Sequence, residues 1–148
     1  MIFVADGAGK ILARTATYFG AQMTMHEWLS PTGGEHKLFN CSLSVPNGSR
    51  REMISAYAVF RPDAKWSFLL INKDPINAVS IELRTKSHLA EVLPNGADLY
   101  QFSRKQYQWD PVLGLPAKSD PPYHAFINAA DAHALDLPPY SLTVLRGN

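Results

Sequence analysis

Two neighbouring stretches of the 148-residue sequence, Ile54–Phe60 (ISAYAVF) and Lys65–Asn72 (KWSFLLIN), decide the fold class. Both are short and rich in the β-branched and aromatic side chains that favour strands. The segment Arg61–Ala64 (RPDA) between them carries the proline and aspartate of a turn. The second stretch is the most apolar of the chain, so we predict a central strand that is buried on both faces.

The chain after residue 35 repeats this pattern of short strands separated by turn residues, with no helical crossover between strands. Four prolines in residues 110–122 predict a long ordered loop without a regular element. Further strands are predicted at residues 36–45, 78–84, 88–93, 97–103, 107–109, 123–128 and 141–146. The pattern predicts an all-β fold, an antiparallel β-sandwich of about eight strands in a jelly-roll or immunoglobulin-like arrangement.

The first thirty residues differ from the rest of the chain. No proline occurs from Lys10 to Leu29, and helical spacing places Leu12, Ala16, Phe19 and Met23 on one face. We predict a helix over residues 11–28, although the alternation of apolar and polar residues at 21–26 is also compatible with a strand. The expected organisation is therefore an N-terminal helix and linker over 1–34, followed by a sandwich domain over 35–148.

Composition excludes several classes of protein. A net charge of +1 argues against a nucleic-acid partner, which requires a basic excess. No apolar run is long enough to span a membrane, at about 18 residues, so no membrane partner is expected. The start, MIFVAD, lacks the features of a signal peptide, and the compartment is left open. The single cysteine, Cys41, excludes an intramolecular disulfide framework and reads as a buried, inert thiol.

Several segments together carry a family resemblance. Ala56–Asp63 (AYAVFRPD), Trp66–Asp74 (WSFLLINKD) and Leu137–Leu145 (LPPYSLTVL) resemble strands of the C-terminal β-sandwich domain attached to (β/α)8-barrel glycoside hydrolases. The families concerned are arabinofuranosidase-like, xylosidase-like and related retaining endoglucanases. Residues 16–28 resemble the last barrel helix, and Asp63-Ala64 replaces the usual Asp-Gly. The resemblance implies an accessory domain, because the catalytic acid/base and nucleophile of the barrel have no counterpart here.

Aromatic side chains are the candidate carbohydrate-binding residues. Tyr107 and Trp109 are two apart, so a strand would present both on one side, about 6.5–7 Å apart. Exposed rings at that spacing can stack on the C–H faces of sugars, and Tyr123, beside two prolines, could join them. Packing in the interior is the competing role for each ring.

Other chemistry has weaker support in the sequence. Two of the 13 acidic residues could form the carboxylate pair of a glycosidase, although most lie where turns or solvent are expected. His26-Glu27 with Glu35-His36 could bind a divalent ion, and Asn72 with Asp74 could bind calcium, but structural roles are expected for both sets. We therefore predict no catalytic residue, no metal and no cofactor.

Three functions remain open from the sequence. The first is an accessory, carbohydrate-binding module of a glycoside hydrolase, whose partners are a polysaccharide or oligosaccharide and a separate (β/α)8 catalytic domain. The second is a small free-standing glycoside hydrolase acting on plant polysaccharide. The third is a structural or oligomerisation domain, in which an exposed apolar helix face would drive self-association.

Overall fold

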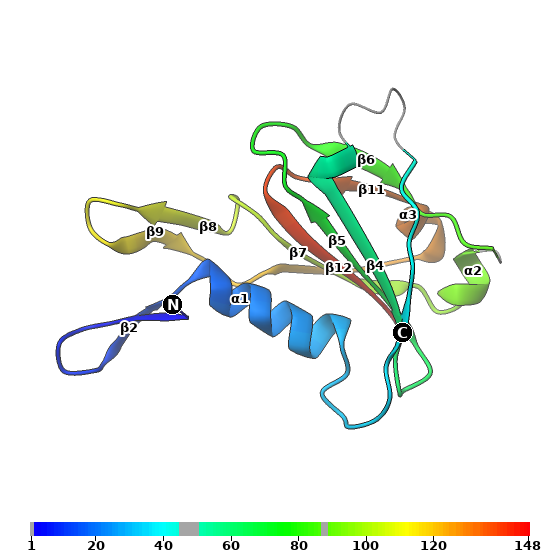
Figure 1. The fold of residues 1–148 in the computed structure, drawn as a ribbon, viewed down its shortest axis with the longest axis horizontal. Helices are drawn as coiled ribbons and strands as arrows, with labels where there is room; N and C mark the ends of the chain where they lie inside the picture. The colour runs from blue at the N-terminus through cyan, green and yellow to red at the C-terminus, as the bar shows by residue number, and fades with distance from the viewer. Residues whose placement is uncertain (1, 45–50, 87–88) are drawn as a thin grey trace.

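A computed structural model describes residues 2–44, 51–86 and 89–148, and its centre is a six-stranded antiparallel sheet (Figure 1). The strand order is β10-β7-β12-β5-β4-β3. The bounds are β3 (Lys37–Phe39), β4 (Ile54–Phe60), β5 (Trp66–Asn72), β7 (Ala97–Phe102), β10 (Tyr123–Ile127) and β12 (Ser141–Gly147). The predicted antiparallel, β-rich fold is therefore confirmed.

The strand β5 is central, as the sequence predicts. It pairs with β4 on one side and with β12 on the other, and Ser67–Leu70 are buried. Register places Leu69 beside Val144 in the same row, and neighbouring residues alternate between the two faces of the sheet. Because both faces of the sheet are apolar, each must be buried against another element of the fold.

A helix covers one face of the sheet. α1 (Ala16–Gln22) continues into η1 (Met23–Trp28), a π-helical segment. Phe19 and Met23 are buried against three side chains of the sheet, which are Leu69, Phe102 and Val144. The apolar face of the helix is thus packed on the sheet of its own chain, which answers a question that the sequence left open.

Residues 11–14 are a strand, and the predicted helix is correct from residue 16 onward. β2 (Ile11–Arg14) pairs with β1 (Phe3–Ala5) as an antiparallel hairpin. The carboxylate of Asp6 accepts hydrogen bonds from the backbone N–H groups of Ala8 and Lys10, which stabilises the turn. This local turn overrides the helical spacing of the apolar residues, and the helix begins only after the extended Thr15.

A second, two-stranded sheet covers the opposite face. β6 (Val79–Glu82) pairs with β11 (Ala134–Leu137), and the short helices α2 (Leu89–Val92) and α3 (Ala129–His133) lie beside them. Leu135 and Leu137 of β11 pack with Phe68, Leu70 and Leu145 of the large sheet. Figure 1 shows the β6–β11 pair and the helix on opposite sides of the large sheet.

A hairpin replaces most of the loop expected at 110–122. β8 (Tyr107–Asp110) pairs with β9 (Leu115–Ser119), in which Pro116 faces Trp109 at an irregularity of the register. A two-stranded ribbon has a free edge along each strand, so the missing N–H of a proline is tolerated there. The expectation of an irregular loop is therefore wrong for these residues.

Three other predictions need correction. The strand expected at 88–93 is the helix α2, with His88 outside the described residues. The strand expected at 36–45 is regular only in β3, and its last residue, Val45, also lies outside them. Cys41 is exposed, not buried, because the chain beyond β3 has left the sheet. No helix in the described part of the chain is long and apolar enough to cross a membrane.

The start of α3 gives a first testable prediction. The side chain of Asn128 accepts a hydrogen bond from the backbone N–H of Asp131 at 2.9 Å, as an N-cap residue does. We expect Asn128→Ala to lower the free energy of unfolding by about 1 kcal/mol. Urea unfolding measures the change, and Asn128→Ser should restore most of it. An unchanged midpoint in Asn128→Ala would contradict the capping role.

Candidate functional site

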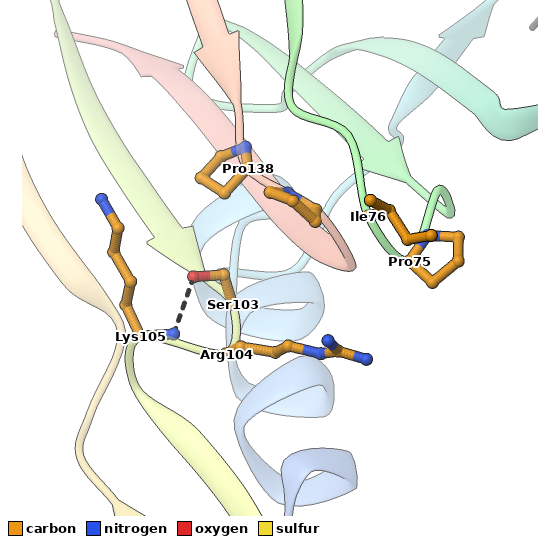
Figure 2. A pocket seen from close by; sticks show the side chains of 7 residues that line it. Pro75, Ile76, Ser103, Arg104, Lys105 and Pro138 are labelled. Carbon is orange, nitrogen blue, oxygen red and sulfur yellow. Dashed lines mark hydrogen bonds between the residues drawn. The ribbon is translucent and has the colours of Figure 1, made fainter.

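Three turns from distant parts of the sequence meet at one end of the large sheet and enclose a hollow of about 320 Å³ (Figure 2). The turn after β5, the turn after β7 and the connection from β11 to β12 each contribute part of its wall. We call it the proline hollow, and its lining residues are Pro75, Ile76, Ser103, Arg104, Lys105, Pro138 and Pro139. The volume is at the lower end of the range for ligand pockets, about 300–1,000 Å³.

The side chain of Asn72 holds two of these walls together. It is 1% exposed, and its amide nitrogen lies within hydrogen-bonding distance of the carbonyl oxygens of Asn77 (2.9 Å), Leu137 (3.1 Å) and Pro138 (2.9 Å). Its amide oxygen accepts the backbone N–H of Asp74 at 3.0 Å. Buried polar groups are costly without partners, so this amide fixes the turns that carry Pro75 and Pro138.

Asp74 extends this arrangement. One oxygen of its buried carboxylate accepts hydrogen bonds from the backbone N–H groups of Ile76 (2.9 Å) and Asn77 (2.8 Å). Its carbonyl oxygen accepts the backbone N–H of Tyr140 at 2.9 Å. Tyr140 has a φ of 44°, a left-handed conformation that is unfavourable for a tyrosine. The contact with Asp74 helps to hold the strained residue beside the hollow.

The third wall is the tight turn after β7. The hydroxyl of Ser103 accepts the backbone N–H of Lys105 at 3.2 Å, and the Ser103 backbone N–H donates to the side-chain oxygen of Gln106 at 3.1 Å. The guanidinium of Arg104 lies over the ring of Tyr140, 5.0 Å from its centroid, which is a cation–π distance. The turn therefore presents two basic side chains from a fixed backbone.

A second polar cluster lies on the helix side of the sheet, near β10. The guanidinium of Arg146 donates hydrogen bonds to the carboxylates of Glu27 (2.5 Å) and Asp98 (2.7 Å) and to the hydroxyl of Tyr100 (2.9 Å). His124 contacts the other oxygen of Asp98 at 2.9 Å, and its ring stacks on Tyr100 with centroids 4.5 Å apart. We call this set the Arg146 cluster. It connects the end of η1 to three strands.

Three groups of the Arg146 cluster have shifted pKa values, and for Arg146 itself burial is outweighed by the hydrogen bond to Asp98 together with nearby charges, which raise the pKa. Burial alone would raise the pKa of the Asp98 carboxyl, but hydrogen bonds from Arg146 and His124 outweigh it and hold the pKa below its ordinary value. Burial is the main cause that raises the pKa of Tyr100 to about 12. Asp98 is therefore a charged partner of Arg146 at neutral pH, and Tyr100 is a neutral hydroxyl.

The three predicted sugar-binding residues do not share one surface. Tyr107 is partly buried in the helix-side core, with its ring 6.1 Å from that of Phe102. Trp109 is 45% exposed on the β8–β9 hairpin, and Tyr123 is 53% exposed at the start of β10. His124 points to the helix side, so the alternation along β10 directs Tyr123 to the opposite side.

Four of the six candidate metal ligands, Glu27, His36, Asn72 and Asp74, have protein partners. The ring nitrogen Nε2 of His36 accepts the backbone N–H of Ser30 at 2.8 Å, and Glu27 binds Arg146. Asn72 presents an amide nitrogen to the surrounding carbonyls, which is the wrong polarity for a calcium ligand. Among the described residues, no group of three His, Cys, Asp or Glu side chains could hold a metal ion.

Sequence reasoning misses both polar sites. From the sequence, Arg104 and Lys105 are predicted to lie in a solvated turn. The prolines at 75, 138 and 139 predict rigid turns elsewhere in the chain, but they do not show that these turns meet Arg104 and Lys105. Nothing in the sequence links Glu27, Asp98 and Arg146. Comparison of the chain with models of protein families, with curated proteins and with solved structures gave no match.

Proposed function

We propose that this chain is an accessory β-sandwich module of a glycoside hydrolase, which binds polysaccharide and is not catalytic by itself. The observation that carries the proposal is the proline hollow. Two of the segments that carry the family resemblance contribute to it: residues 137–145 supply Pro138 and Pro139 of its lining, and Asn72 of residues 66–74 holds the adjoining turns. A hollow with rigid apolar walls and a few polar groups is typical of a binding site.

The layered arrangement supports the sandwich. Val79 and Ile81 of β6 and Leu135 and Leu137 of β11 pack on the face of the large sheet opposite the helix. Two sheets that bury apolar side chains between them are the defining feature of a sandwich. The second sheet is small, and α2 and α3 complete its layer. The helix at residues 16–28, which resembles the last barrel helix in sequence, packs on the other face of the large sheet.

The Arg146 cluster favours a binding module over a free-standing hydrolase. Glu27 and Asp98 are two carboxylates that converge on one guanidinium, so they are the first candidates for a glycosidase pair. A general acid in such a pair needs a raised pKa, whereas the pKa of Asp98 is lowered. The cluster instead binds the helix to the sheet.

Exposed apolar side chains on two hairpins support association with another domain. The β1–β2 and β8–β9 hairpins both extend away from the sheet (Figure 1), and Ser119 of β9 donates to the carbonyl of Arg14 at 3.2 Å. Their exposed apolar residues are Phe3, Ile11, Leu12, Trp109, Val112 and Leu113. Self-association through these hairpins is the second candidate role, and light scattering over a concentration series tests it.

Binding to polysaccharide tests the proposal. We expect the protein to be retarded in affinity electrophoresis on xylan, arabinan or soluble cellulose derivatives. Because stacking on an exposed ring contributes about 1 kcal/mol, Trp109→Ala or Tyr123→Ala should weaken binding by roughly fivefold if that ring contacts the sugar. Tyr57→Ala is the matched control, since Tyr57 is similarly exposed but packs beside Trp28. No retardation on any of these glycans, and none on polygalacturonate, would refute the binding role.

A further inference from the structure

The basic side chains of the proline hollow have no acidic partner. No carboxylate among the described residues lies within ion-pair distance of Arg104 or Lys105. Other exposed basic residues, such as Lys37 and Lys65, also lack a carboxylate partner in the part of the chain that the structure describes, but Arg104 and Lys105 are the ones that line the hollow. An anion in the hollow would meet two basic side chains that no carboxylate of the described residues neutralises. The hollow is therefore complementary in charge to an acidic ligand.

The positions of the two basic side chains restrict the class of ligand that can bind both of them. In Figure 2 the Arg104 side chain runs beneath Pro75 and Ile76, while Lys105 rises on the other flank, near Pro138. Because the two side chains extend in different directions from the turn, two separate anionic groups suit them better than one small anion. A chain with a negative charge on each of two successive units can meet both.

The apolar walls of the hollow also restrict the class of ligand. The rings of Pro75, Pro138 and Pro139 and the side chain of Ile76 form most of the lining. Such surfaces pack well on the C–H groups of a pyranose ring but contribute little to the binding of inorganic phosphate. The guanidinium of Arg104 uses its face on Tyr140, so the N–H groups at its edge are free to bind a carboxylate in a bidentate manner.

We propose that the proline hollow binds a short polyuronate, an oligosaccharide with a carboxylate on successive rings. Arg104 binds one carboxylate, Lys105 binds the next, and the proline rings contact the sugar between them. This proposal rests on the proposed function, because it names the class of glycan that the module takes. It assigns specificity to the turn after β7, which is separate from the exposed aromatics Trp109 and Tyr123.

Isothermal titration of the whole chain with trigalacturonate tests the proposal. We expect binding at low salt that weakens as the salt concentration rises, and a loss of about tenfold or more in Arg104→Gln/Lys105→Gln. The matched control is Lys37→Gln/Lys65→Gln, which removes the same charge from exposed positions outside the hollow and should bind as the wild type does. Circular dichroism melting verifies that both double variants are folded.

The same titration with three further probes distinguishes the outcomes. The probes are neutral xylotriose, monomeric galacturonate and inorganic phosphate. Weaker binding of all three than of trigalacturonate supports the proposal. Equal binding of phosphate and trigalacturonate would make the hollow a general anion site and overturn it. Retention on neutral polysaccharide without any affinity for trigalacturonate would refute the polyuronate proposal and leave the proposed function standing. Failure to bind any glycan, neutral or acidic, would refute both.

Discussion

Replacement of Asn72 by alanine is expected to lower the free energy of unfolding by about 3 kcal/mol. The substitution removes the amide that serves three carbonyl oxygens on two turns, and it leaves one buried and two partly buried carbonyl groups without their donor. An unsatisfied buried polar group costs about 1–3 kcal/mol, and the small cavity adds to this. For a chain of this length the melting temperature should fall by roughly 6–12 °C.

The matched control for this prediction is Asn95→Ala. Asn95 is exposed and makes one hydrogen bond, at 3.2 Å, to the carbonyl of Asn148. Its loss should change stability by no more than about 0.5 kcal/mol. Calorimetry of both variants measures the difference. If the melting temperatures of Asn72→Ala and Asn95→Ala agree within about 2 °C, the turns around the proline hollow are held by other contacts.

Replacement of Arg146 by methionine is expected to cost about 2–3 kcal/mol. Methionine keeps much of the aliphatic packing but leaves Glu27 and Asp98 without their shared cation and Tyr100 without its hydrogen-bond donor. Breaking a buried ion pair costs about 3–5 kcal/mol, and the partial exposure of this cluster reduces that value. Because Glu27 lies in η1, the packing of the helix on the sheet should loosen as well.

Arg84→Met is the control for Arg146→Met. Arg84 also binds a carboxylate, that of Glu82 at 2.5 Å, but its side chain is 79% exposed. Water and salt screen such a pair, so its loss should lower stability far less than the loss of Arg146. Denaturant unfolding at pH 7 compares the two variants. Equal losses would show that the Arg146 cluster is a surface ion pair and does not anchor the helix.

The pH dependence of Arg146→Met follows from the lowered pKa of Asp98. A carboxyl with a lower pKa in the folded state stabilises the protein above its unfolded pKa, about 3.9, and this contribution disappears as the pH falls through the folded value. In the variant without Arg146, the burial of Asp98 raises the pKa of its carboxyl, which is the opposite direction. The stability difference between wild type and variant should therefore be largest near pH 7 and shrink below pH 4. A constant difference from pH 7 to pH 3 would exclude the ionic role of Asp98.

The sequence by itself determined the central part of the fold. Ile54–Phe60 is a strand with the predicted bounds, and Trp66–Asn72, Ala97–Phe102 and Ser141–Gly147 agree within one residue at each end. These segments are long enough to show their apolar pattern, and prolines or glycines separate them. Local signals suffice because burial on a sheet imposes a period of two on the residues themselves.

Two of the strands that were not predicted from the sequence have different causes: tertiary contacts decide β11, whereas a local turn decides β2. β11 (Ala134–Leu137) has only four residues and becomes a strand because β6 and the apolar face of the large sheet are there to receive it. β2 is a strand because the turn at Asp6 outcompetes the helical spacing of its apolar residues. Short segments carry too few side chains for their own preference to determine the outcome.

Both polar sites likewise depend on contacts between distant residues. Asn72 lies 65 residues from Leu137, and Glu27 lies 119 residues from Arg146, yet each pair is joined by a hydrogen bond. The sequence contains the amide, the carboxylates and the guanidinium, but no spacing rule connects them. Only the folded sheet brings the three turns together, because antiparallel pairing returns the chain to the same end after each pair of strands. The proline hollow is a product of that topology.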